Sequence, residues 1–160
     1  MLSPKKIYVG KGIQSRIIID SNVIIDTFDP SSPNYETSYK FMDHIVGRKV
    51  LFAMPMHGWF EITCTLNRIK KNKRIVPPIF DGKPQMPVEF IHIDDQFLQN
   101  YVDVDVPSIK AMDYLFLVVA KKNDLPLVTW DKPMTKAASE CGIQVYNPKQ
   151  WMDKNVIGHQ

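Results

Sequence analysis

The sequence predicts an α/β fold in which helices sandwich a mostly parallel central sheet. The first observation is the apolar run at 16–19, which is short and β-branched, as is typical of a buried parallel strand. The second is that similar apolar runs follow at 50–54, 88–93, 127–129 and 143–146. The third is that segments of helical period separate these runs. Strands that alternate with helices indicate a three-layer sandwich around a parallel sheet.

The helices are predicted from apolar spacing and from capping residues. Apolar side chains repeat at three- and four-residue steps over 34–46 and 57–70, and a short helix is expected after Asp20. Asp94 should cap a helix that ends near Tyr101, and Ser108 should cap a helix over 109–123. That last helix is apolar nearly all round, so we expect it to be buried. Shorter helices are expected over 134–141 and 148–152.

Length and composition predict one domain over residues 1–160. Within it we distinguish an N-terminal arm (1–15), a basic, proline-rich insertion (67–87) and a C-terminal tail (148–160). Cys64 and Cys141 form no metal-binding or disulfide pattern, and we expect reduced core thiols in a cytoplasmic protein. The longest apolar run is too short for a membrane span, and no signal peptide is expected.

Four acidic residues have placements that suggest a common site. Asp20 and Asp131 each directly follow a predicted strand, where the functional crevice of an open α/β sheet lies. Asp113 would be the fifth residue of the buried helix, too far in to cap it, and a buried carboxylate is costly unless it is paired or coordinated. The helical register of Glu61 alone directs it to solvent. The alternative is four unrelated acids that cap helices or lie at the surface.

If the four carboxylates share a crevice, a cation must offset their repulsion. Oxygen ligands favour Mg²⁺ or Mn²⁺, which can orient water and stabilise the leaving oxygen in phosphodiester hydrolysis. A basic cluster in the 67–87 insertion is a candidate RNA-binding surface, although a solvated helix end would look the same. Its residues are Arg68, Lys70, Lys71, Lys73 and Arg74.

The order of these motifs resembles the PIN-domain nucleases, and most of all the compact branch that includes VapC-type toxins. The resemblance covers about residues 16–148. It rests on four features in order: the strand ending in Asp20-Ser21-Asn22, a proline-ended strand before the helix of Glu61, Met112-Asp113-Tyr114, and Leu127-Val128-Thr129-Trp130-Asp131. Trp130 departs from the family pattern, which commonly has a smaller or polar residue there.

The resemblance implies a PIN-like sandwich with an acidic cleft for Mg²⁺ or Mn²⁺ and endoribonuclease activity. It makes Asp20, Glu61, Asp113 and Asp131 the metal-site acids, with Ser21, Asn22 and Thr129 as supporting polar residues. It also implies an RNA substrate, an antitoxin partner for a toxin, and a homodimer. Two alternatives remain: a PIN-like module that binds RNA or protein without cutting, and an α/β phosphatase or phosphotransferase. The latter usually has a second acid two residues after its nucleophilic Asp, where this chain has Asn22.

Overall fold

The computed structural model describes residues 16–69 and 87–156, in which a five-stranded parallel sheet forms the centre of the molecule. The strand order is β3-β2-β1-β4-β5, and every neighbouring pair is parallel. The strands are β1 (Arg16–Ile19), β2 (Leu51–Pro55), β3 (Val88–Ile91), β4 (Leu127–Val128) and β5 (Val145–Tyr146). The α/β class predicted from the sequence is therefore confirmed.

The first strand, β1, is the central strand of the sheet, and helices cover both of its faces. Ile17, Ile18 and Ile19 are at most 1% exposed. Ile18 pairs with Ala53 of β2 on one side and Leu127 of β4 on the other. The chain passes from β1 to β2 and later returns to β4, so the strand order reverses between β1 and β4. In open α/β sheets the functional crevice lies outside the carboxyl ends of the strands at such a point.

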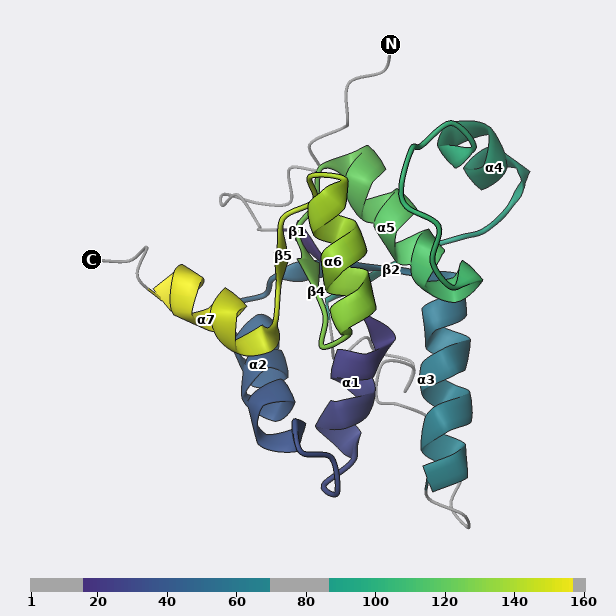
Figure 1. Ribbon diagram of the computed structural model, residues 1–160. Helices are drawn as coiled ribbons and strands as arrows, with labels where there is room; N and C mark the ends of the chain where they lie inside the picture. The colour runs from purple at the N-terminus through teal and green to yellow at the C-terminus, as the bar shows by residue number, and fades with distance from the viewer. Residues whose placement is uncertain (1–15, 70–86, 157–160) are drawn as a thin grey trace.

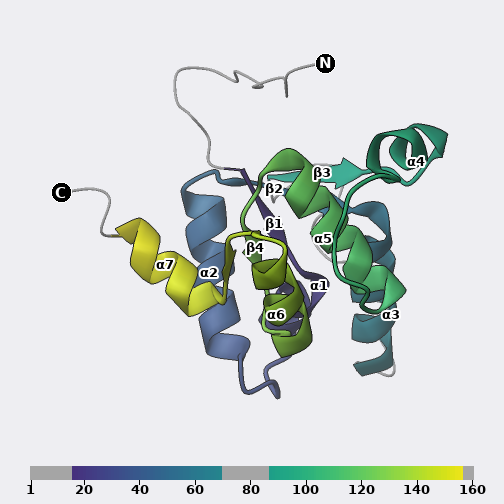
Figure 2. The same cartoon turned by 45° about the horizontal axis from the view of Figure 1, so that its top comes forward.

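Helices cover both faces of the sheet. α1 packs between α2 and α3 on one face, while α5 and α6 lie together on the other (Figure 1, Figure 2). Right-handed crossovers between parallel strands require this division, because the chain reverses direction across the sheet after β3. The helices are α1 (Ser21–Phe28), α2 (Tyr35–Gly47), α3 (Met56–Ile69), α4 (Asp95–Tyr101), α5 (Ala111–Asn123), α6 (Lys132–Glu140) and α7 (Pro148–Val156).

The last helix is longer than the predicted turn and is anchored by a tryptophan. Trp151 is 4% exposed and makes edge-on ring contacts with Phe41 and His44 of α2, at centroid distances of 5.5 and 5.7 Å. An aromatic side chain buries a large apolar area, so this contact stabilises the docking of α7 against α2.

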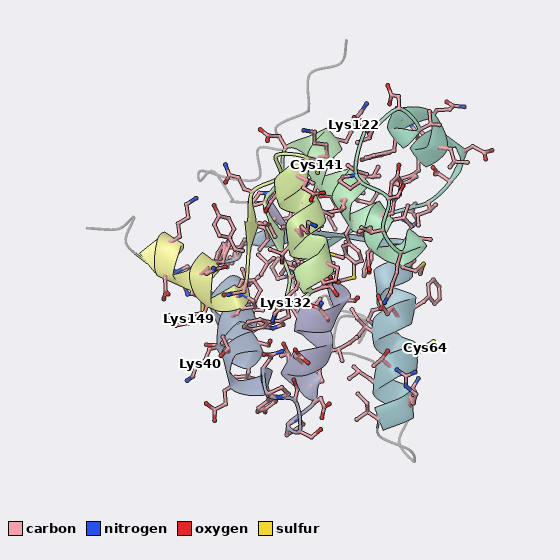
Figure 3. All side chains as sticks on the ribbon, viewed as in Figure 1. Lys40, Cys64, Lys122, Lys132, Cys141 and Lys149 are labelled. Carbon is pink, nitrogen blue, oxygen red and sulfur yellow. The ribbon has the colours of Figure 1, made fainter. Side chains whose placement is uncertain are left out.

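Three sequence predictions are wrong in detail. α5 begins at Ala111, after an extended Lys110, and not at residue 109 after a Ser108 cap. Its burial is restricted to Phe116–Ala120, whereas Ala111 and Met112 are exposed. Cys64 is not a core thiol: it lies on the exposed side of α3, and Cys141 is half-buried (Figure 3). Both cysteines are unpaired, as predicted.

The predicted N-terminal arm and most of the basic insertion lie outside the described residues. Among the helices of the described ranges, none combines the length and apolar character that a bilayer crossing needs.

Candidate acidic active site

Asp20 lies where β1 and β4 end side by side. Its backbone N–H donates to the Val128 carbonyl at 3.0 Å, which continues the pairing of the two strands by one residue. The residue is 3% exposed. It occupies the N-cap position of α1, but its side chain makes no cap hydrogen bond. The capping explanation for this acid is therefore wrong, and its carboxylate is used elsewhere.

The carboxylate of Asp20 is held by Thr129, the residue that follows β4. The Thr129 hydroxyl donates to Asp20 Oδ2 at 2.6 Å. The Thr129 hydroxyl oxygen Oγ1 in turn accepts from the backbone N–H of Asp131 at 2.9 Å and from the side-chain amide of Asn22 at 3.4 Å. Asn22 Oδ1 in turn accepts from the Trp130 backbone N–H at 3.4 Å. Thr129 and Asn22 thus connect the two acids that follow β1 and β4.

Glu61 occupies an exposed position of α3, as the helical spacing predicts. Its carboxylate nevertheless reaches the start of α1. The Ser21 hydroxyl donates to Glu61 Oε2 at 2.5 Å and lies 3.3 Å from Asp20 Oδ1. A hydroxyl has a single proton, and the shorter distance directs it to Glu61. Ser21 therefore lies between these two acids and links α1 to α3.

Asp113 is half-buried in the first turn of α5 rather than inside a fully buried helix. It was predicted as the fifth helical residue, but the later start of the helix makes it the third. A negative charge in the first turn is favoured by the helix dipole, so part of its cost is offset. Within the described part of the chain its carboxylate has neither a hydrogen bond nor an ion pair, and its oxygens are available.

Asp131 is the N-cap of α6, and its Oδ1 accepts from the Met134 backbone N–H at 2.6 Å. For this residue the capping explanation is right. It accounts for one carboxylate oxygen only, since Oδ2 has no hydrogen bond among the described residues. Capping and a role in the site are therefore compatible here.

The charges of the four acids act on one another. Burial, followed by the charges of Glu61 and Asp113, raises the pKa of Asp20 to about 7, against the lowering effects of the Thr129 hydroxyl and of the Asn22 backbone N–H. Burial and the charges of Asp131 and Glu61 raise the pKa of Asp113, while Lys110 lowers it. Because carboxylates raise one another's pKa only at short range, the four acids form one electrostatic cluster.

The donor set fits a hard divalent cation. It consists of carboxylate oxygens with excess negative charge, and Mg²⁺ typically binds one or two carboxylates and keeps several waters. In residues 16–69 and 87–156, no three His, Cys, Asp or Glu side chains converge closely enough to enclose a metal ion on their own. The shared metal site of the four acids therefore stays a prediction.

One contact near the site was not foreseen from the sequence. The Trp130 indole N–H donates to the hydroxyl of Ser38, a fully buried residue of α2, at 2.9 Å. The bond joins the segment that carries Asp131 to a helix 92 positions earlier in the chain. No local pattern predicts a pair so distant in sequence.

Of the predicted basic cluster, only Arg68 lies within the described residues, where it is exposed in the last turn of α3. Lys70, Lys71, Lys73 and Arg74 fall outside them. The RNA-binding role of this cluster stays a prediction.

Comparison with known proteins identifies the family of the chain. The family model described as PIN domain matches residues 17–140, which include all four acids. The chain belongs to the PIN-domain family, whose members are generally nucleases. No curated protein matches the chain. A solved structure titled "Crystal Structure of FitAcB from Neisseria gonorrhoeae" is 20% identical, with a TM-score of 0.44, and the match covers 83% of this chain and 98% of that one.

Proposed function

We propose that this PIN-domain chain is a divalent-metal-dependent endoribonuclease that hydrolyses phosphodiester bonds of RNA. Its metal-binding and catalytic acids would be Asp20, Glu61, Asp113 and Asp131. One observation carries the proposal: Asp20 is buried where β1 and β4 end side by side, and its burial, together with the nearby charges of Glu61 and Asp113, raises its pKa to about 7. A cluster of acids that repel one another stabilises nothing by itself, whereas a bound Mg²⁺ or Mn²⁺ would neutralise it.

Each residue of the cluster has a distinct part in the proposed site. Thr129 fixes Asp20 at the strand end, and Ser21 fixes Glu61 beside it. Asp113 would complete the ligand set on the side of α5 and α6, together with Asp131 Oδ2, which has no hydrogen bond among the described residues. Bound Mg²⁺ or Mn²⁺ would polarise the scissile phosphate and lower the pKa of a bound water. The basic residues of the 68–74 cluster would bind the RNA backbone through its phosphates.

The activity can be tested with a mixed set of single-stranded and structured RNAs. We expect cleavage with Mg²⁺ or Mn²⁺, none with EDTA, and a loss of several orders of magnitude in Asp20→Asn. Asp153→Asn is the matched control, because Asp153 forms only an exposed ion pair with Lys149 on α7. Absence of cleavage by the wild type, or full activity of Asp20→Asn, would refute the proposal.

The biological form we propose is a cytoplasmic toxin with an antitoxin partner, on the basis of the motif resemblance to compact VapC-type proteins. Expression of the wild type in a bacterial host should then arrest growth, while Asp20→Asn should not. Light scattering of the purified chain tests the homodimer that the resemblance implies. If the host grows normally while it contains active enzyme, the toxin proposal is refuted and the nuclease proposal stands.

A further inference from the structure

The start of α3 lies beside the start of α5 in both views, and the two helices carry Glu61 and Asp113 (Figure 1, Figure 2). Gly58 of α3 and Phe116 of α5 lie in contact between them. Gly58 is buried in the first turn of α3, and a Cβ placed on it would lie 2.9 Å from Phe116 Cζ. Such a Cβ would also lie 3.1 Å from Cγ of Met54. A side chain at position 58 would therefore force one of these neighbours to shift.

The contact lies one helical turn from both acids. Gly58 precedes Glu61 by three residues, and Phe116 follows Asp113 by three. Residues three apart lie on the same side of a helix, so a shift at the contact moves the carboxylates directly. His57 strengthens the contact, because its ring meets the Phe116 ring edge-on at a centroid distance of 5.2 Å.

Phe116 cannot easily move away from a larger residue at position 58. Its side chain is fully buried, and close-packed cores resist the addition of even one methyl group. The overlap must therefore be relieved by separation of the two helices, which also separates Glu61 from Asp113.

We propose that Gly58 and Phe116 are positioning residues that set the distance between Glu61 and Asp113 and thereby the divalent-metal affinity of the site. The inference rests on the proposed function, since it assumes that these acids bind a metal. It adds a specific cause for their spacing, namely the absence of a side chain at position 58.

The test is Mn²⁺ binding to the full chain without RNA, measured by calorimetry or by the spectrum of free Mn²⁺. We expect Gly58→Ala to weaken binding on the order of 10–100-fold, the usual effect of losing support around metal ligands. Phe116→Leu shortens the ring and should restore most of the affinity in the double variant. Gly47→Ala is the matched control, because a Cβ there has nothing within 4 Å.

A second control separates positioning from stability. Ile45→Val removes one methylene from a fully buried residue of α2 and should lower the melting temperature without changing Mn²⁺ affinity. If Gly58→Ala does not fold, Gly58→Ala/Phe116→Leu is compared with Phe116→Leu alone, and it should bind Mn²⁺ nearly as well. Unchanged affinity in a folded Gly58→Ala, or no rescue by Phe116→Leu, overturns the inference. Failure of the wild type to bind Mn²⁺ overturns the proposed function instead.

Discussion

Replacement of Asp20 by Asn should stabilise the metal-free protein, and the effect should depend on pH. The pKa of Asp20 rises from 3.8 to about 7, chiefly through burial, so the folded state holds a proton that the unfolded state loses. Stability from this residue is therefore fully present below about pH 4 and is lost as the pH rises to about 7. Because a raised pKa favours the neutral form, a neutral isostere removes this loss.

The magnitude follows from the shift in pKa. About three units at roughly 1.4 kcal/mol each give at most about 4 kcal/mol, nearly all of it expressed between pH 4 and 8. Asn keeps the size of Asp and can still accept the hydrogen bond from Thr129. We therefore expect near-equal stability at pH 4 and a more stable Asp20→Asn at pH 8.

Urea unfolding in EDTA at several pH values measures this difference, with Asp153→Asn as the control for a surface carboxylate. The wild-type free energy of unfolding should fall with rising pH relative to that of Asp20→Asn. A variant that is less stable than the wild type at pH 8, or a stability difference independent of pH, would refute the raised pKa of Asp20 on which this prediction rests. Excess Mg²⁺ should stabilise the wild type and not the variant.

Three further predictions concern Asp113, the basic cluster and Trp130. Asp113→Asn should leave the metal-free protein at least as stable as the wild type but abolish its stabilisation by Mg²⁺ or Mn²⁺; a loss of several kcal/mol without metal, seen in a thermal melt, would make Asp113 structural. Alanine at the basic positions between 70 and 74 should reduce the slope of log affinity against log salt by about 0.7 per lost phosphate contact with single-stranded RNA, and an unchanged slope would indicate a solvated surface. Trp130→Phe should cost about 1 kcal/mol through loss of the hydrogen bond to Ser38, and a double-mutant cycle with Ser38→Ala should show coupling.

The fold class could be predicted from the sequence because each strand has a local signal, a short run of apolar residues. The isoleucines of β1 are buried on both faces, and this requirement appears directly as a β-branched run that ends in Asp20. The position of Asp20 at the reversal of strand order then follows from general rules of α/β topology.

The details of the site depend on contacts between distant segments, which local patterns do not contain. The side chain of Glu61 faces Ser21 only because α1 packs against α3. The predicted start of α5 is wrong because Ser108 is a good capping residue, but the helix begins only after Lys110. The spacing at Gly58 likewise depends on Phe116, a residue of another helix.

The positions of the acids show that helix capping and a role in the active site do not exclude one another in this fold. Asp20 and Asp131 both follow strands at the N-cap of a helix, where the helix dipole partly offsets their charge. Asp131 uses one oxygen as a cap, whereas Asp20 forms no cap and is held by Thr129. A fold selected for stability alone would use both carboxylates as caps and would not retain a buried acid with a pKa near 7. The residual repulsion is the physical reason to expect a cation at this edge of the sheet.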